Sequence, residues 1–132
     1  LELYPGSHLG PIFEHYDSQG VWTGAVREQD LAGVGPDGPI AVTGPAGTVS
    51  VHHSRTIHGS GQNQSSQGRP VLVLTYSAAD AIPYTAPAYP SSRYGVLVRG
   101  EEPGYAHHEE LHVPMPPDWS DGYTSIFAHQ EK

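Results

Sequence analysis

The sequence predicts an all-β fold, a sandwich or barrel of short strands. Its 16 glycines and 13 prolines make up 29 of the 132 residues, well above average usage and typical of many tight turns. Apolar residues recur with period two, and no stretch shows the spacing of a long helix. Short alternating runs separated by glycine and proline favour a sandwich or barrel over a helical bundle.

Six short runs are predicted to be strands, and Val71–Tyr76 is the clearest of them. Its sequence, VLVLTY, is apolar on both faces, which is typical of a central strand. A helical turn is predicted at 28–31, and an irregular segment that covers the sheet is predicted at 81–93. The predicted strands are 1–4, 21–26, 39–43, 48–53, 71–76 and 95–99.

The charge and the composition exclude several classes of partner and site. The formal net charge is −8, so phosphate backbones and anionic lipid surfaces are disfavoured, and neither nucleic acid nor a membrane is expected as a partner. No cysteine is present, so a metal would have to be bound by His, Asp or Glu. No signal peptide and no apolar run long enough to span a bilayer is visible, so a cytoplasmic location is expected.

Residues 49–76 combine several groups that could form a binding site. His58 follows a predicted strand and precedes Gly59-Ser60-Gly61, where the backbone can turn tightly. Arg69 opens the most apolar predicted strand, and its planar guanidinium suits a carboxylate. A neutral imidazole nearby suits Fe(II), so one hairpin could present a metal ligand and a carboxylate clamp.

This hairpin resembles the last hairpin of the double-stranded β-helix in the phytanoyl-CoA dioxygenase family. Residues 58–65 fit the pattern HGSxxNxS, Arg69 follows at the family's spacing, and Pro5-Gly6-Ser7-His8 resembles the family's PGSH segment. The resemblance implies that 1–80 form the C-terminal half of a cupin-like jelly roll. Residues 81–132 are then expected to be a Pro- and Tyr-rich covering segment and tail of the same domain.

The resemblance also implies a function and a set of site residues. His58 would bind Fe(II), Arg69 would bind the far carboxylate of 2-oxoglutarate with help from Ser60, and a small organic substrate would be hydroxylated. The family's other two iron ligands, a His-x-Asp pair, precede PGSH by several tens of residues. We therefore expect a fragment that lacks this pair, is inactive alone, or self-associates through exposed sheet edges.

Alternatives remain open for several histidines. His15-Tyr16-Asp17 could replace the missing pair or could lie in a loop after PGSH. Residues 108–112 match the HExxH motif of zinc hydrolases, but the prolines that follow disfavour the required helix, and a solvated acidic loop is the other interpretation. Only one of His52 and His53 can face the same side as His58. A non-catalytic cupin-like binding or subunit module would share the fold without the iron.

Overall fold

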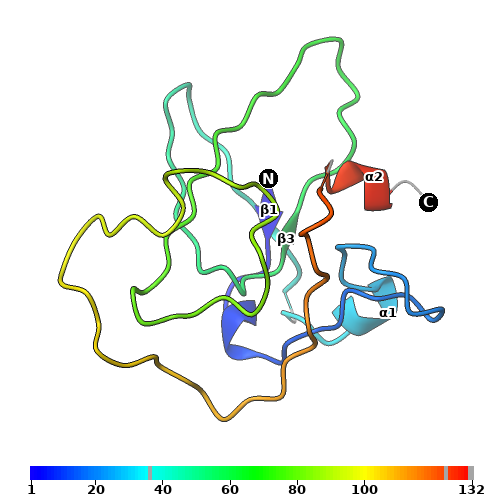
Figure 1. Cartoon of the computed structure of the whole chain (residues 1–132). Coiled ribbons are helices and arrows are strands. Elements are labelled where there is room, and N and C mark those ends of the chain that lie inside the picture. Colours follow the sequence, from blue (N-terminus) through cyan, green and yellow to red (C-terminus); the bar gives the residue numbers. More distant parts are fainter. Residues whose placement is uncertain (36, 124, 131–132) are drawn as a thin grey trace.

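A computed structural model describes residues 1–35, 37–123 and 125–130, and most of this chain is coil around a small sheet (Figure 1). The sheet has three antiparallel strands in the order β2-β1-β3. Short helices flank it. In chain order the elements are β1 (Glu2–Leu3), η1 (Ser7–Leu9, a 3-10 helix), α1 (Glu28–Leu31), β2 (Ile40–Ala41), β3 (His58–Gly59) and α2 (Phe127–Gln130).

Strand β1 is the centre of the sheet and pairs with both neighbours. Leu3 lies opposite Ile40 of β2 and opposite His58 of β3. Two backbone hydrogen bonds extend this pairing, from the Tyr4 N–H to the Ile57 carbonyl and from the Val42 N–H to the Leu1 carbonyl, both 2.9 Å long. The N-terminal residues are therefore fixed against the segment that contains His58.

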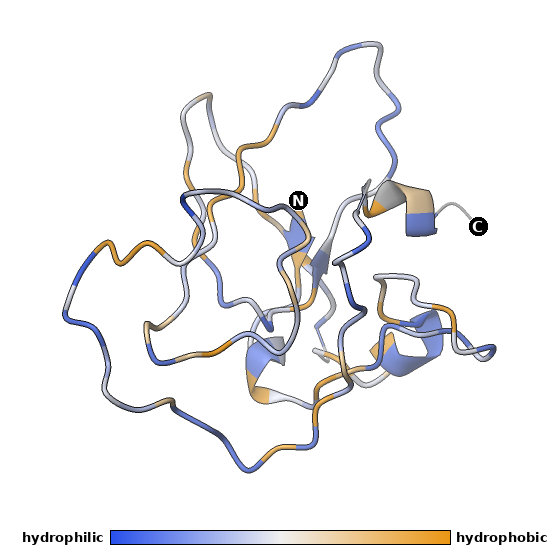
Figure 2. Ribbon diagram, in the orientation of Figure 1, coloured by the Kyte–Doolittle hydropathy of each residue, from blue (hydrophilic) through white to orange (hydrophobic). Residues whose placement is uncertain are grey.

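The described residues contain no buried apolar side chain. The one buried residue among them is Thr56, which is 6% exposed. Figure 2 shows apolar segments along the outer loops as well as near the sheet, so hydrophobic side chains are not gathered in an interior. Backbone and side-chain hydrogen bonds therefore hold the central sheet, with little contribution from apolar burial.

The predicted central strand at 71–76 is wrong. These residues form no strand, and Leu72 is 84% exposed. A strand that is apolar on both faces needs a layer on each side, and the described part of the chain supplies neither. The runs at 21–26, 48–53 and 95–99 form no strand either, apart from an isolated bridge between Tyr16 and Trp22.

Other predictions are confirmed, and the overall class is confirmed only in its antiparallel sheet. Strands β1 and β2 lie inside the predicted runs 1–4 and 39–43, and α1 coincides with the predicted helical turn at 28–31. Strand β3 lies in the stretch predicted to be a turn after a strand. A complete jelly roll is not present in the described residues, which form a single sheet of two-residue strands.

The C-terminal segment contacts the N-terminal half through aromatic rings. Trp119 packs edge-on against Trp22, with ring centres 4.9 Å apart, and Tyr123 packs edge-on against Trp119 at 4.7 Å. His129 of α2 also lies 5.2 Å from Trp22. Gly24 lies beneath this group at a φ of 65°, and a side chain there would meet Trp22. The aromatic group therefore joins segments about a hundred residues apart in sequence.

The helices of the described residues are short. None of them combines the length and the apolar character that a helix needs to cross a bilayer.

Candidate functional site

His58 lies on edge strand β3 with an exposed side chain. Its Nδ1 is 2.7 Å from the Thr56 carbonyl oxygen. Because a carbonyl oxygen can only accept, the ring nitrogen must carry the proton and donate it. Nε2 is then unprotonated in the neutral ring and has a lone pair available for a ligand.

The backbone before His58 is fastened to the Pro5-Gly6-Ser7-His8 turn. The Ser7 hydroxyl donates to the Tyr4 carbonyl at 2.7 Å and accepts from the Ile57 N–H at 2.8 Å. The Arg55 guanidinium donates to the Gly10 carbonyl at 2.7 Å. Gly6, with a φ of 78°, allows the turn that brings Ser7 to this position. Sequence analysis did not assign this role to Ser7, although the short Gly-Ser pair before a helical turn is a signal for it.

The loop that follows His58 is closed by two members of the HGSxxNxS pattern. The Asn63 side-chain oxygen accepts from the Ser65 N–H at 3.0 Å and from the Ser65 hydroxyl at 2.8 Å. The Asn63 side-chain nitrogen donates to the Gln67 carbonyl at 2.7 Å. These bonds form an Asx-type turn. Asn63 and Ser65 thus order the connection between His58 and Arg69, a role that their polar character alone did not reveal.

Arg69 and Ser60, the predicted 2-oxoglutarate residues, both have exposed side chains. Within the described ranges Arg69 forms no ion pair, because the salt bridge found there joins Arg27 to Asp30 at 2.6 Å. Neither side chain forms a hydrogen bond with a described residue, and no contact brings Arg69 to His58. The guanidinium is therefore free of competing protein carboxylates in this part of the chain.

His52 is the histidine that lies beside His58. The two ring centres are 4.8 Å apart, and the ring planes are tilted by 58°. His53 instead lies 5.5 Å from His8, and its Nδ1 accepts a hydrogen bond from the Arg55 N–H. The structure thus separates two neighbouring histidines that the sequence left as alternatives.

His15 and Asp17 form part of a hairpin-like turn. Asp17 Oδ1 accepts from the Gln19 N–H at 2.9 Å and the Val21 N–H at 2.8 Å, and the His15 carbonyl accepts from the Thr23 N–H at 2.8 Å. Partial burial lowers the pKa of His15 from its ordinary value, because the charged ring loses solvation. The carboxylate is occupied in the turn, which favours the loop interpretation over a replacement iron pair.

The HExxH interpretation is wrong for this chain. Residues 108–112 are exposed and non-helical, whereas that motif needs a helix to direct both histidines at one ion. Across the residues that the structure describes, no group of three or more His, Cys, Asp or Glu side chains could hold a metal ion. His58 thus fits one position of an iron site, but the described residues do not fit the full three-ligand set.

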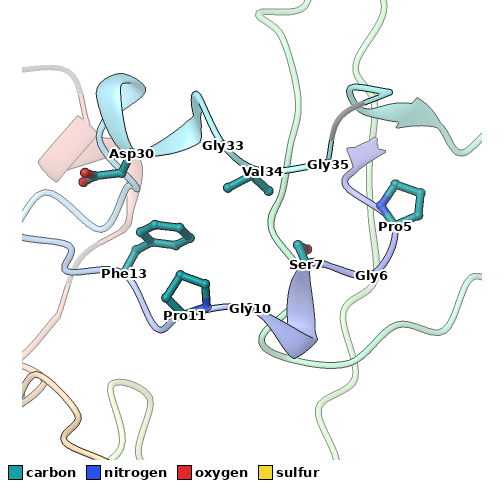
Figure 3. Close-up of a pocket in the computed structure, with 10 residues that line it drawn as sticks. All are labelled: Pro5, Gly6, Ser7, Gly10, Pro11, Phe13, Asp30, Gly33, Val34 and Gly35. Carbon is teal, nitrogen blue, oxygen red and sulfur yellow. The ribbon is translucent and has the colours of Figure 1, made fainter.

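A pocket of about 450 Å³ lies between the PGSH turn and α1 (Figure 3). Pro11, Phe13 and Val34 give it a mainly apolar wall, and Asp30 is its one charged lining residue. The Asp30 carboxylate already binds Arg27. None of His58, Ser60 and Arg69 lines this pocket, so the largest hollow of the described residues is separate from the predicted cofactor residues.

Comparison with known proteins identifies relatives of one kind. The family model for phytanoyl-CoA dioxygenase (PhyH) matches residues 1–71. A probable alpha-ketoglutarate-dependent hypophosphite dioxygenase from Stutzerimonas stutzeri is 33% identical over 132 residues, covering 98% of this chain and 46% of the relative. An L-proline trans-4-hydroxylase from Streptomyces griseoviridis is 40% identical over 97 residues, covering 63% of this chain and 36% of the relative. The chain thus spans less than half the length of either curated relative. No solved structure matches.

Proposed function

The chain belongs to the phytanoyl-CoA dioxygenase family, and we propose that it acts as the cofactor-binding part of an Fe(II)- and 2-oxoglutarate-dependent dioxygenase. In this proposal Arg69 binds the far carboxylate of 2-oxoglutarate, Ser60 adds a hydrogen bond, and His58 provides one iron ligand. The complete enzyme hydroxylates a small molecule.

The hydrogen bond from His58 to Thr56 supports this proposal most directly. Histidines that bind metals usually donate their second ring N–H to a carbonyl or carboxylate, which fixes the tautomer and the ring orientation. His58 has this arrangement, with Nδ1 2.7 Å from the carbonyl oxygen of buried Thr56. The ring therefore directs an unprotonated Nε2 away from its own backbone and toward any bound ion.

Arg69 supports the proposal through its unpaired guanidinium. No carboxylate of the described residues lies within ion-pair distance, so a ligand carboxylate would not have to displace one. The order that Asn63 gives to the preceding loop limits the freedom of Arg69 and lowers the entropy lost on binding. A bidentate guanidinium–carboxylate pair is the strongest hydrogen-bonded arrangement available to a dicarboxylate.

Iron with 2-oxoglutarate supplies the oxidative chemistry of the family when it is bound. Fe(II) in such oxygenases is held by two histidines and one carboxylate, and the described residues provide only His58 in a suitable setting. We therefore propose that the other two ligands come from residues outside those described. The contribution of this chain is to hold a neutral imidazole at Nε2 and a cation at Arg69.

A small substrate is the class that we propose. The two curated relatives carry the names of a hypophosphite dioxygenase and an L-proline hydroxylase, both of which refer to small polar molecules. A net charge of −8 disfavours a polyanionic CoA thioester, because repulsion lowers the local concentration of such a ligand.

Binding of 2-oxoglutarate tests the clamp. Arg69→Ala should weaken the affinity by about 10- to 100-fold, the effect of losing hydrogen bonds to a charged group. Arg99→Ala is the matched control, because Arg99 is also exposed and forms no side-chain hydrogen bond with described residues. Calorimetric titration of the 132-residue chain measures both. Equal affinities of the Arg69→Ala variant and the wild type would remove Arg69 from the site.

A non-catalytic binding or subunit module is the second candidate. It is favoured by the lack of any three-ligand group among the described side chains. Titration of Mn(II) with and without 2-oxoglutarate separates the two functions, because a dioxygenase part should bind the ion and the acid more tightly together. Independent binding, or binding of the acid alone, would favour the module.

Self-association through sheet edges stays a prediction. Strands β2 and β3 form the two edges, and each is only two residues long, so each offers few unpaired backbone groups. Sedimentation at several protein concentrations would measure the association directly.

A further inference from the structure

His52 and His58 form a pair of exposed imidazoles outside the 2-oxoglutarate clamp. We propose that these two rings together bind one divalent first-row transition-metal ion in this chain, with water in the remaining coordination positions. The inference rests on the proposed role of His58 as a metal ligand and adds His52 as a second ligand, which neither the family model nor the relatives assign.

The spacing of the two rings matches joint coordination. Metal–nitrogen bonds to histidine are about 2.0–2.1 Å long, so two imidazoles on one ion, at angles between square and tetrahedral, have ring centres about 4.5–5.2 Å apart. The His52 and His58 ring centres are 4.8 Å apart. A planar stack would prevent both lone pairs from meeting at one point, and the observed tilt of 58° avoids this arrangement.

The hydrogen bonds of the two rings leave suitable nitrogens free. His58 uses Nδ1 to donate to Thr56 and keeps Nε2 for the ion. The His52 ring forms no hydrogen bond with the described residues, so either of its nitrogens can coordinate after a small rotation. Imidazole nitrogens suit Fe, Co, Ni, Cu and Zn ions, and two of them leave positions for water.

The neighbouring pair, His8 and His53, lacks these features. Its ring centres are 5.5 Å apart, beyond the span given above, and His53 Nδ1 already accepts from the Arg55 N–H. His53 is adjacent to His52 and equally exposed, so it serves as a matched control for a histidine that does not bind the ion. The net charge of −8 favours cation approach to both pairs alike and therefore does not discriminate between them.

Titration with Co(II), measured by calorimetry on the untagged 132-residue chain, tests the pair. We expect one ion per chain, and we expect His52→Gln and His58→Gln each to weaken binding at least tenfold. His53→Gln should leave the affinity within twofold of the wild type. The double variant His52→Gln/His58→Gln should bind no more weakly than the weaker single variant, because the two rings act on one ion.

The outcomes separate this inference from the proposed function. Unchanged affinity in His52→Gln with a tenfold loss in His58→Gln overturns the pair but keeps His58 as a ligand. Unchanged affinity in His58→Gln overturns both. Equal small losses in all three single variants indicate non-specific binding to histidines and also overturn the pair.

A measurement on the wild type does not depend on how the variants fold. Co(II) is paramagnetic and broadens the NMR signals of the rings that bind it. The ring signals of His52 and His58 should broaden together at a substoichiometric amount of the ion, before those of His53 and of the exposed His108 and His112. Broadening of His58 without His52 overturns the proposal.

Discussion

Residues 1–59 and residues 60–76 both contain family motifs, and they are held in different ways. The first region is fixed by directed hydrogen bonds between distant segments, with Ser7 contacting Ile57 and Arg55 contacting Gly10. The second is closed only by local bonds around Asn63, and the side chains after it are largely exposed. A short polar motif can therefore be ordered without a core, whereas an apolar run becomes a strand only where other layers cover it.

Loss of the Ser7 hydroxyl should have the largest effect on this comparison. Ser7→Ala leaves the Ile57 N–H without its acceptor, which costs about 1–2 kcal/mol for a partly buried group. Amide hydrogen exchange should show the protection of Ile57 falling about fivefold or more. The exposed Ser66 has no hydrogen bond to described residues, and Ser66→Ala should leave this protection unchanged. An equally protected Ile57 in Ser7→Ala would show that the contact contributes nothing.

The second effect concerns pH and is smaller. Burial lowers the pKa of His15 below its ordinary 6.5, so the unfolded chain takes up this proton more readily than the folded chain. The stability of the first region should therefore be full above pH 6.5 and should fall as the pH decreases from 6.5 to the lowered pKa. Urea unfolding midpoints at pH 7.5 and 5.5 should differ less in His15→Gln than in the wild type. A larger difference in the variant would give the opposite sign and refute the assignment.

The smallest effect is expected in the second region. Leu72 is 84% exposed, so Leu72→Ser should change the free energy of unfolding by no more than about 0.5 kcal/mol. A buried leucine would cost about 2–5 kcal/mol on truncation. Leu3→Ser is the comparison variant, because Leu3 is partly buried in the central strand β1 and should be the more costly of the two. A loss above about 2 kcal/mol in Leu72→Ser would mean that 71–76 are covered in solution.

The family and the local turns were predictable from the sequence, and the strands were predictable only in part. The HGSxxNxS pattern, the PGSH segment and the spacing of Arg69 identified the family correctly. The helical turn at 28–31 follows from local sequence, and its prediction was right. The run at 71–76 was assigned as a strand because its composition is apolar, but pairing depends on neighbours that a local pattern does not contain.

The candidate site shows the same division. The sequence indicated His58, Ser60 and Arg69, whose joint role stays a prediction. It did not indicate which of His52 and His53 lies beside His58, because alternation along an extended segment allows either. The hydrogen bond from His58 to Thr56 also depends on local backbone geometry that residue types do not specify.

The contact between Trp22 and Trp119 has an optical consequence. These are the two tryptophans of the chain, and their rings meet edge to face across nearly a hundred residues of sequence. All indole fluorescence therefore originates from one place, where the C-terminal segment meets the hairpin near Gly24. Separation of these two segments would expose both chromophores to water at once, so emission wavelength reports the docking of the tail without any added label.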